Sequence, residues 1–182
     1  EIVNVQQKIP FWIKKLDAET KQFRTLRGSP QYTNITITES GETEAAASGV
    51  NITSAGGYLF LADPGTTYTV VENQAPNGYY VNNSSMSFAV PDDLTITTEN
   101  MEKLLTDHSY TDASGEKVTL EYVIANDKKP QAAIQKFNES GSKLAISFDV
   151  YTKDTDGSFK PTGQSITTAA GTTDNYITLE AG

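Results

Sequence analysis

Residues 68–79 read YTVVENQAPNGY, and this stretch decides how the rest of the sequence is interpreted. Side chains alternate along a β-strand, so Tyr68, Val70 and Glu72 are expected on one face. The segment APNG at residues 75–78 is a turn signal, because Pro and an Asn-Gly pair favour chain reversal. The stretch therefore predicts a strand whose apolar face ends in an acidic side chain, followed by a turn.

Two other segments end an apolar stripe with a polar side chain in the same way. The stripe Phe11, Ile13 ends at Lys15, and the stripe Leu120, Tyr122, Ile124 ends at Asn126. Taken singly, each polar residue is best explained as a strand-end side chain that reaches solvent. Because buried charges are normally paired or neutralised, three such ends on three strands invite a joint explanation.

Short segments with a period of two dominate the remaining sequence, and Gly, Pro, Asn and Asp clusters separate them. One short helix is expected at residues 99–105. This pattern predicts an all-β fold built as a sandwich. The expected strands are residues 11–16, 32–38, 57–61, 67–72, 85–90, 118–125, 132–136, 145–151 and 176–179.

The chain also repeats itself with a period of about 120 residues. Residues 1–15 (EIVNVQQKIPFWIKK) resemble residues 122–136 (YVIANDKKPQAAIQK). Asn4 corresponds to Asn126, 122 positions later, and Lys15 to Lys136, 121 positions later, so the two segments match with a one-residue gap between these pairs. The repeat predicts the last strand of a preceding copy at residues 1–9, a complete domain at 10–129, and the N-terminal part of a following, truncated domain at 130–182. The short linker near residues 127–130 favours a stiff string of domains.

Composition excludes several classes of function. The 182 residues include 14 Lys and Arg against 23 Asp and Glu, a net charge of −9, so nucleic-acid binding is not expected. The absence of cysteine excludes disulfides, thiol nucleophiles and Cys-type zinc sites. No stretch is apolar enough to insert into a membrane, and no signal peptide or sorting signal is recognisable. The sequence is therefore interpreted as a mature fragment.

The quoted stretch resembles the Y-x-h-x-E-x-x-A-P-x-G-Y box (h is apolar) of CnaB-type domains. These are prealbumin-like, Ig-like β-sandwiches of Gram-positive adhesins and sortase-assembled pilins. Residues 13–20 (IKKLDAET) resemble the first strand of that family, and residues 123–128 (VIANDK) resemble its closing strand. The resemblance covers nearly all of residues 10–129. It implies tandem CnaB-type sandwiches on an extracellular, cell-wall-anchored protein whose anchor lies outside this sequence.

The resemblance also implies a chemistry for the three polar strand ends. In the family, a first-strand Lys and a last-strand Asn join through an intramolecular isopeptide bond that a Glu assists. Here the trio is Lys15, Asn126 and Glu72, with Glu72 as the catalytic acid. Burial favours a neutral amine and a protonated acid, as the reaction requires. Asn4 and Lys136 are the possible cross-link residues of the neighbouring, incomplete repeats.

The adjacent Lys14 would take the place of Lys15 if the strand slipped by one residue. Lys15 is preferred because it shares parity with Ile13 and matches Lys136.

Three functional interpretations follow. The first is a structural stalk or pilin-type module whose partners are neighbouring domains of the same polypeptide. The second is a binding module that grips a host extracellular-matrix protein or glycan. The third, an enzyme acting on an external substrate, is disfavoured by a lone His108 and by the absence of a convincing carboxylate pair. No cofactor or metal is expected, and Asp154–Gly157 (residues DTDG) is interpreted as a turn rather than a calcium loop.

Overall fold

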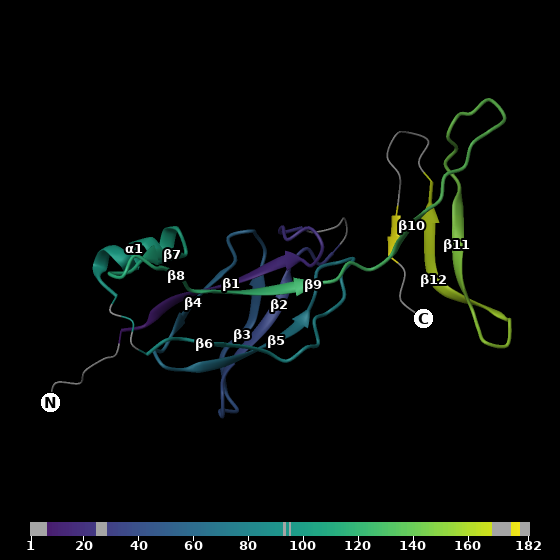
Figure 1. Ribbon diagram of the computed structural model, residues 1–182. Coiled ribbons are helices and arrows are strands. Elements are labelled where there is room, and N and C mark those ends of the chain that lie inside the picture. Colours follow the sequence, from purple (N-terminus) through teal and green to yellow (C-terminus); the bar gives the residue numbers. More distant parts are fainter. Residues whose placement is uncertain (1–6, 25–28, 93, 95, 169–175, 179–182) are drawn as a thin grey trace. The chain divides into compact units, whose positions relative to one another are not determined.

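Two facing sheets form the first part of the chain. The structure, a computed structural model, describes residues 7–24, 29–92, 94, 96–168 and 176–178 (Figure 1). The smaller sheet has the order β4 (Tyr58–Ala62), β1 (Ile9–Asp17), β9 (Glu121–Asn126). Strand β1 runs antiparallel to β4 and parallel to β9. Strands β1 and β9, which are the first and last strands of the unit along the chain, are therefore neighbours.

The larger sheet has the order β3 (Ala45–Ile52), β2 (Thr33–Glu39), β5 (Thr67–Gln74), β6 (Met86–Ala89). All neighbouring strands of this sheet are antiparallel. Strand β5 contains the start of the box that opened the sequence analysis, and it lies in the interior of this sheet. The predicted all-β sandwich is confirmed.

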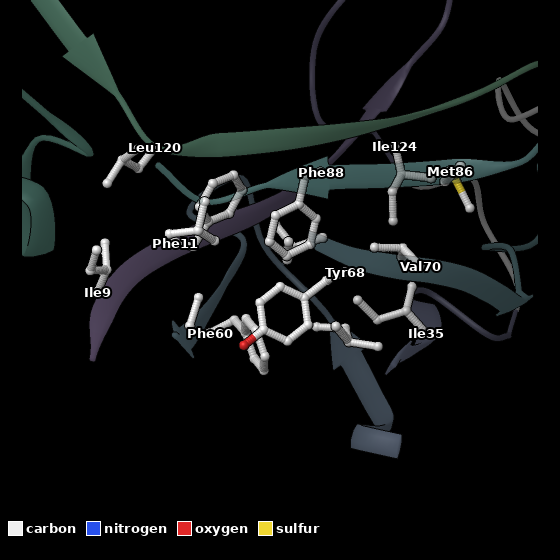
Figure 2. Packing of buried hydrophobic residues seen from close by; sticks show 14 of the residues in the cluster. Ile9, Phe11, Ile35, Phe60, Tyr68, Val70, Met86, Phe88, Leu120 and Ile124 are labelled. Carbon is white, nitrogen blue, oxygen red and sulfur yellow. The ribbon is translucent and has the colours of Figure 1, made fainter. Parts of the chain in front are cut away.

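The core lies between the two sheets, where the inward side chains of both meet. Figure 2 shows this packing, including Phe11, Phe60, Tyr68 and Phe88. The rings of Phe11 and Phe88 stack with centroids 4.2 Å apart, and Phe60 meets Tyr68 edge-on at 4.9 Å. Aromatic contacts therefore join β1 and β4 of one sheet to β5 and β6 of the other.

A helical insertion separates β6 from β9. It consists of α1 (Thr98–Thr106), β7 (Ser109–Thr111) and β8 (Lys117–Thr119). The Trp12 Nε1 donates a hydrogen bond to the Leu104 carbonyl oxygen at 2.8 Å. The helix expected at residues 99–105 is thus present, and it is fastened to β1.

Some strands differ from the expected ones. The strand expected at residues 118–125 is two strands, β8 and β9, and Leu120 lies between them. Strands β3 and β7 of this unit were not predicted. The sequence of β3, AAASGVNI, lacks apolar alternation because this edge strand is mostly exposed, so it carried no periodic signal.

Gly57 immediately precedes β4 and has φ +84°, and an added Cβ there would lie 2.5 Å from the Ile13 carbonyl oxygen. Gly57→Ala is expected to destabilise the domain by about 1–3 kcal/mol, through both strain and this clash. Gly41 is the matched control, because its φ is +93° but a Cβ there meets nothing within 4 Å. Urea unfolding followed by the fluorescence of Trp12 measures both variants, and equal losses would show that the clash contributes nothing.

The chain divides into two units, Glu1–Lys128 and Lys129–Gly182. In the second unit, β10 (Gln131–Ala133) pairs with β13 (Tyr176–Thr178), and β11 (Ser147–Lys153) pairs with β12 (Phe159–Thr167). Strand β12 was not predicted, because only Ile166 along it is buried. Phe159 is 67% exposed, so the described part of this unit covers its apolar surface incompletely. That this unit is a truncated repeat stays a prediction.

Candidate functional site

Three polar side chains meet inside the first unit, one on each of three strands. Lys15 of β1, Glu72 of β5 and Asn126 of β9 are 1%, 4% and 1% exposed. Each ends the inward apolar stripe on which the sequence analysis placed it. Such burial is costly for ionisable groups unless they are paired or neutral, so the three polar groups require an explanation within the fold.

The parallel register of β1 and β9 sets the spacing between two of these residues. Lys15 is the Cα partner of Ile124, and Asp17 is the partner of Asn126. Asn126 is therefore two residues beyond the partner of Lys15 and on the same face. Strand spacing and rise put their Cα atoms about 8 Å apart, which the long lysine side chain can span towards the short asparagine.

Glu72, on the opposite sheet, is hydrogen-bonded to the side chain of Asn126. The Asn126 Nδ2 donates to the Glu72 Oε2 at 2.6 Å and to the Tyr80 carbonyl oxygen at 3.0 Å. The Asn82 backbone N–H also donates to the Glu72 Oε2, at 2.6 Å. Glu72 thus contacts the amide nitrogen of Asn126, which is the atom that would leave as ammonia if the carbonyl carbon were attacked.

Three buried oxygen atoms near this pair have no hydrogen-bond partner within the described part of the chain. They are the Glu72 Oε1, the Asn126 Oδ1 and the Thr33 Oγ1. Unpaired buried polar atoms are uncommon in folded proteins and call for an explanation. Two of the three belong to the carboxyl and carboxamide groups themselves, so these two groups retain unused hydrogen-bonding capacity.

Burial shifts the Lys15 amine towards its neutral form. Its Nζ donates to the Arg24 carbonyl oxygen at 3.0 Å and lies 3.7 Å from the centre of the Tyr79 ring. Burial lowers the pKa of Lys15 to about 8, although the charges of Asp17 and Glu72 oppose this shift. Burial likewise raises the pKa of Glu72, against the bond from the Asn82 amide. Both shifts favour the neutral forms.

The alternative lysine faces the other side of the sheet. The Lys14 Nζ pairs with the Glu121 Oε2 at 2.6 Å, and its side chain is 22% exposed. The register therefore places Lys15, not Lys14, on the inward face. Of the two residues named for neighbouring repeats, Asn4 lies outside the described residues, and Lys136 is exposed beyond the end of β10.

Sequence reasoning missed two groups that adjoin the site. Asp17 is buried, and its Oδ2 accepts a hydrogen bond from the Tyr79 hydroxyl at 2.8 Å. Both residues belong to the motifs quoted from the sequence, but no role was assigned to either. For Asp17 the sequence did contain a signal, since Asp17 follows Lys15 by two residues and is therefore expected on the same face of the strand.

Other candidate sites have less support. The Asp156 Oδ1 accepts bonds from the backbone and hydroxyl of Ser158, and Asp154 pairs with Lys160, so residues 154–157 form a closed turn. Across the described ranges, no group of three or more His, Asp or Glu side chains could hold a metal ion. A pocket of about 210 Å³ is smaller than the 300–1,000 Å³ usual for small-molecule sites. Its lining residues are Gln7, Ile9, Pro64, Asp92, Leu94 and Ile96.

Among the residues that the structure describes, no helix has the length and apolar character needed to cross a membrane.

Comparison with solved structures gives matches among surface proteins of Gram-positive bacteria. The pilus 2b backbone protein of group B streptococcus is 20% identical, with a TM-score of 0.43 over 69% of this chain and 43% of that chain. BcpA, the major pilin subunit of Bacillus cereus, is 12% identical, with a TM-score of 0.45 over 73% of this chain and 32% of that chain. This chain therefore spans less than half the length of either protein.

The pilus adhesin SpaC from Lactobacillus rhamnosus GG, in its open conformation, is 16% identical, with a TM-score of 0.45 over 93% of this chain and 22% of that chain. Among curated proteins, no sequence matches this chain. The family profile described as the SpaA prealbumin-like fold domain matches residues 11–104, which is more than half of the chain. This match agrees with the resemblance drawn from the sequence, and the chain belongs to the SpaA prealbumin-like fold domain family.

Proposed function

We propose that this chain is a structural stalk module of a pilin-type or adhesin protein on the surface of a Gram-positive bacterium. An autocatalytic amide bond between Lys15 and Asn126 holds its first unit together. One observation carries the proposal, namely the burial of Lys15, Glu72 and Asn126 together, with no solvent to stabilise their charges. The module is not an enzyme, since the reaction consumes its own side chains once.

The reaction begins with the neutral amine of Lys15. Its Nζ attacks the Asn126 side-chain carbonyl carbon and forms a tetrahedral intermediate. The protonated carboxyl of Glu72, which contacts the Asn126 Nδ2, gives its proton to that leaving nitrogen and takes one from the attacking Nζ, so Glu72 ends the reaction protonated as it began. The C–Nδ2 bond breaks, ammonia leaves, and a C–Nζ amide remains. The fold supplies proximity, which can be worth about 7–11 kcal/mol of the barrier.

The mechanical consequence follows from the topology of the smaller sheet. Strands β1 and β9 are the first and last of the unit, and they lie side by side in parallel (Figure 1). Tension applied along the chain enters at the start of β1 and leaves at the end of β9. A bond from Lys15 to Asn126 passes that load directly between the two strands, so the intervening residues bear little of it.

The family and the surface proteins that the chain resembles support an extracellular location. Within the parent protein, we propose a tandem arrangement. Residues 1–9 end one repeat, residues 10–129 form a complete one, and residues 130–182 begin the next. Neighbouring domains of the same polypeptide are then the partners of this module.

The intact mass of the purified chain tests the bond. Wild type is expected to be lighter than its sequence mass by one ammonia. Lys15→Ala and Glu72→Ala are each expected to keep the full mass, because one lacks the nucleophile and the other the proton carrier. Tandem mass spectrometry of a digest should then find one branched peptide that contains both Lys15 and Asn126.

Lys14→Ala is the matched control, since Lys14 lies next to Lys15 but faces the other side of β1 and pairs with Glu121. It is expected to lose ammonia as wild type does. Full mass in wild type would refute the bond, and full mass in Lys14→Ala alone would show that the wrong lysine has been assigned.

A further inference from the structure

A second buried polar cluster lies directly beside the amine of Lys15, and the proposed reaction does not use it. Its members are Asp17, on the same face of β1 as Lys15, and Tyr79, which follows the turn after β5. The face of the Tyr79 ring lies 3.7 Å from the Lys15 Nζ. The hydroxyl of the same ring donates to the Asp17 Oδ2 at 2.8 Å. Tyr79 therefore contacts both the amine and the nearest carboxylate of the same strand.

Asp17 accepts four hydrogen bonds from groups other than Lys15. Its Oδ1 accepts from the Glu19 and Thr20 backbone N–H groups, at 3.0 and 2.7 Å, and from the Thr20 hydroxyl at 3.0 Å. Its Oδ2 accepts from Tyr79. These bonds hold the pKa of Asp17 at about 2 despite burial, so the group is a carboxylate at neutral pH.

This carboxylate is the natural competitor for the Lys15 amine. Side chains two apart on one strand face are neighbours, and a carboxylate within about 4–6 Å favours the protonated form of an amine. An ion pair would hold Lys15 in its protonated form, which is not a nucleophile. Yet the Lys15 Nζ donates to the Arg24 carbonyl oxygen, and the Asp17 Oδ2 is bonded to Tyr79 instead. The hydroxyl of Tyr79 thus competes with the Lys15 amine as a donor to the Asp17 Oδ2.

We propose that Tyr79 is a positioning residue for the cross-linking reaction. Its hydroxyl donates to Asp17 and its ring packs against the Lys15 amine, and together these contacts hold Asp17 away from an ion pair with that amine. This inference rests on the proposed function, because it concerns the rate of the same bond. The charged or titratable groups around the amine are Asp17 on its own strand, Glu72 from β5, and Tyr79 and Arg24 from the neighbouring loops.

Tyr79→Phe tests the role of the hydroxyl, because the ring remains. Without the Tyr79 hydroxyl, Asp17 should form an ion pair with Lys15 and raise the pKa of the Lys15 amine. At a pH below this pKa, an increase of about one unit lowers the neutral fraction of the amine tenfold, so cross-linking near neutral pH should slow about 10-fold. The loss should disappear at alkaline pH. Adding Asp17→Asn to Tyr79→Phe should restore the rate near neutral pH, because asparagine forms no ion pair.

The rate is measured on newly made full-length chains. A short cell-free synthesis is stopped in urea, the chains are exchanged into folding buffers from pH 6 to pH 10, and the loss of ammonia is followed by intact mass. Tyr122→Phe is the matched control, because Tyr122 is half-buried on β9 and the hydrogen bonds found for the described residues do not include its hydroxyl. It should react as wild type does.

A Tyr79→Phe rate equal to wild type at every pH would overturn the inference. So would a loss that is the same at every pH and is not rescued by Asp17→Asn, since that pattern indicates a general defect of folding. In both cases wild type still loses ammonia, and the proposed function stands. If wild type itself keeps its full mass, the proposed bond is refuted, and the role of Tyr79 with it.

Discussion

Glu72→Gln is expected to lower the unfolding temperature of the first unit by about 15–25 °C. Glutamine keeps the shape of Glu72 but cannot carry the proton, so the variant should fold without its cross-link. The bond joins positions about 110 residues apart, and a disulfide that closes such a loop stabilises by about 4–5 kcal/mol through the unfolded chain. For a domain of this size that loss corresponds to the stated shift.

Trp12 makes the measurement specific to this unit, because it is the only tryptophan and it lies in β1. Thermal unfolding followed by its fluorescence, with intact mass recorded for each sample, compares the variant with wild type. Lys15→Met is the matched control. It also lacks the bond, but it removes the buried amine, so it should be more stable than Glu72→Gln. If Glu72→Gln keeps its full mass and unfolds within about 5 °C of wild type, the bond does not set the stability.

The positions of the three site residues could be predicted from the sequence for a simple physical reason. Alternation along a strand assigns every second side chain to one face, and apolar neighbours identify which face is inward. Glu72 follows Tyr68 and Val70, which are 2% and 1% exposed, and Lys15 follows the fully buried Ile13. The face on which each residue lies can thus be predicted from its neighbours in the sequence. The pairing of strands cannot be predicted in this way, and only the family resemblance indicated that the first and last strands come together.

The parts that could not be predicted depend on contacts between segments far apart in the sequence. Strand β3 pairs along β2 with mostly exposed small residues, so its hydrogen bonds rather than its side chains define it. The hydrogen bond from the Tyr79 hydroxyl to Asp17 joins residues 62 positions apart. No periodicity marks such a pair, and each residue alone has an ordinary explanation in a turn or at a strand end.

The burial of the site also explains why a covalent bond suits it. An unreacted site places an amine with a pKa of about 8 and a carboxyl with a raised pKa in the interior, together with unpaired oxygen atoms. Such groups destabilise a folded domain. Formation of a neutral amide and loss of ammonia remove the ionisable amine. The cost of burying these groups, which destabilises the unreacted domain, therefore favours formation of the amide.

A variant that cannot react should reveal the buried amine through the pH dependence of its stability. In Glu72→Gln, Lys15 remains a free amine, and the loss of the Glu72 charge removes one influence that holds its pKa up. The pKa is then at or below about 8 in the folded state and about 10.4 in the unfolded chain. Between these values the unfolded chain binds more protons, so the free energy of unfolding rises with pH. We expect a gain of about 2–3 kcal/mol from pH 8 to pH 10.5.

Wild type should lack this rise, because the nitrogen of an amide does not titrate. Tyrosines contribute equally to both proteins, and burial, with the bond to Asp17, raises the pKa of Tyr79 to about 12, above the window. The double variant Lys15→Met/Glu72→Gln is the control and should follow wild type in its slope. Urea unfolding of all three proteins at several pH values from 7 to 10.5 gives the free energies. A rise of equal size in wild type would mean that Lys15 is still a free amine, and an equal rise in the double variant would assign the titration to another group.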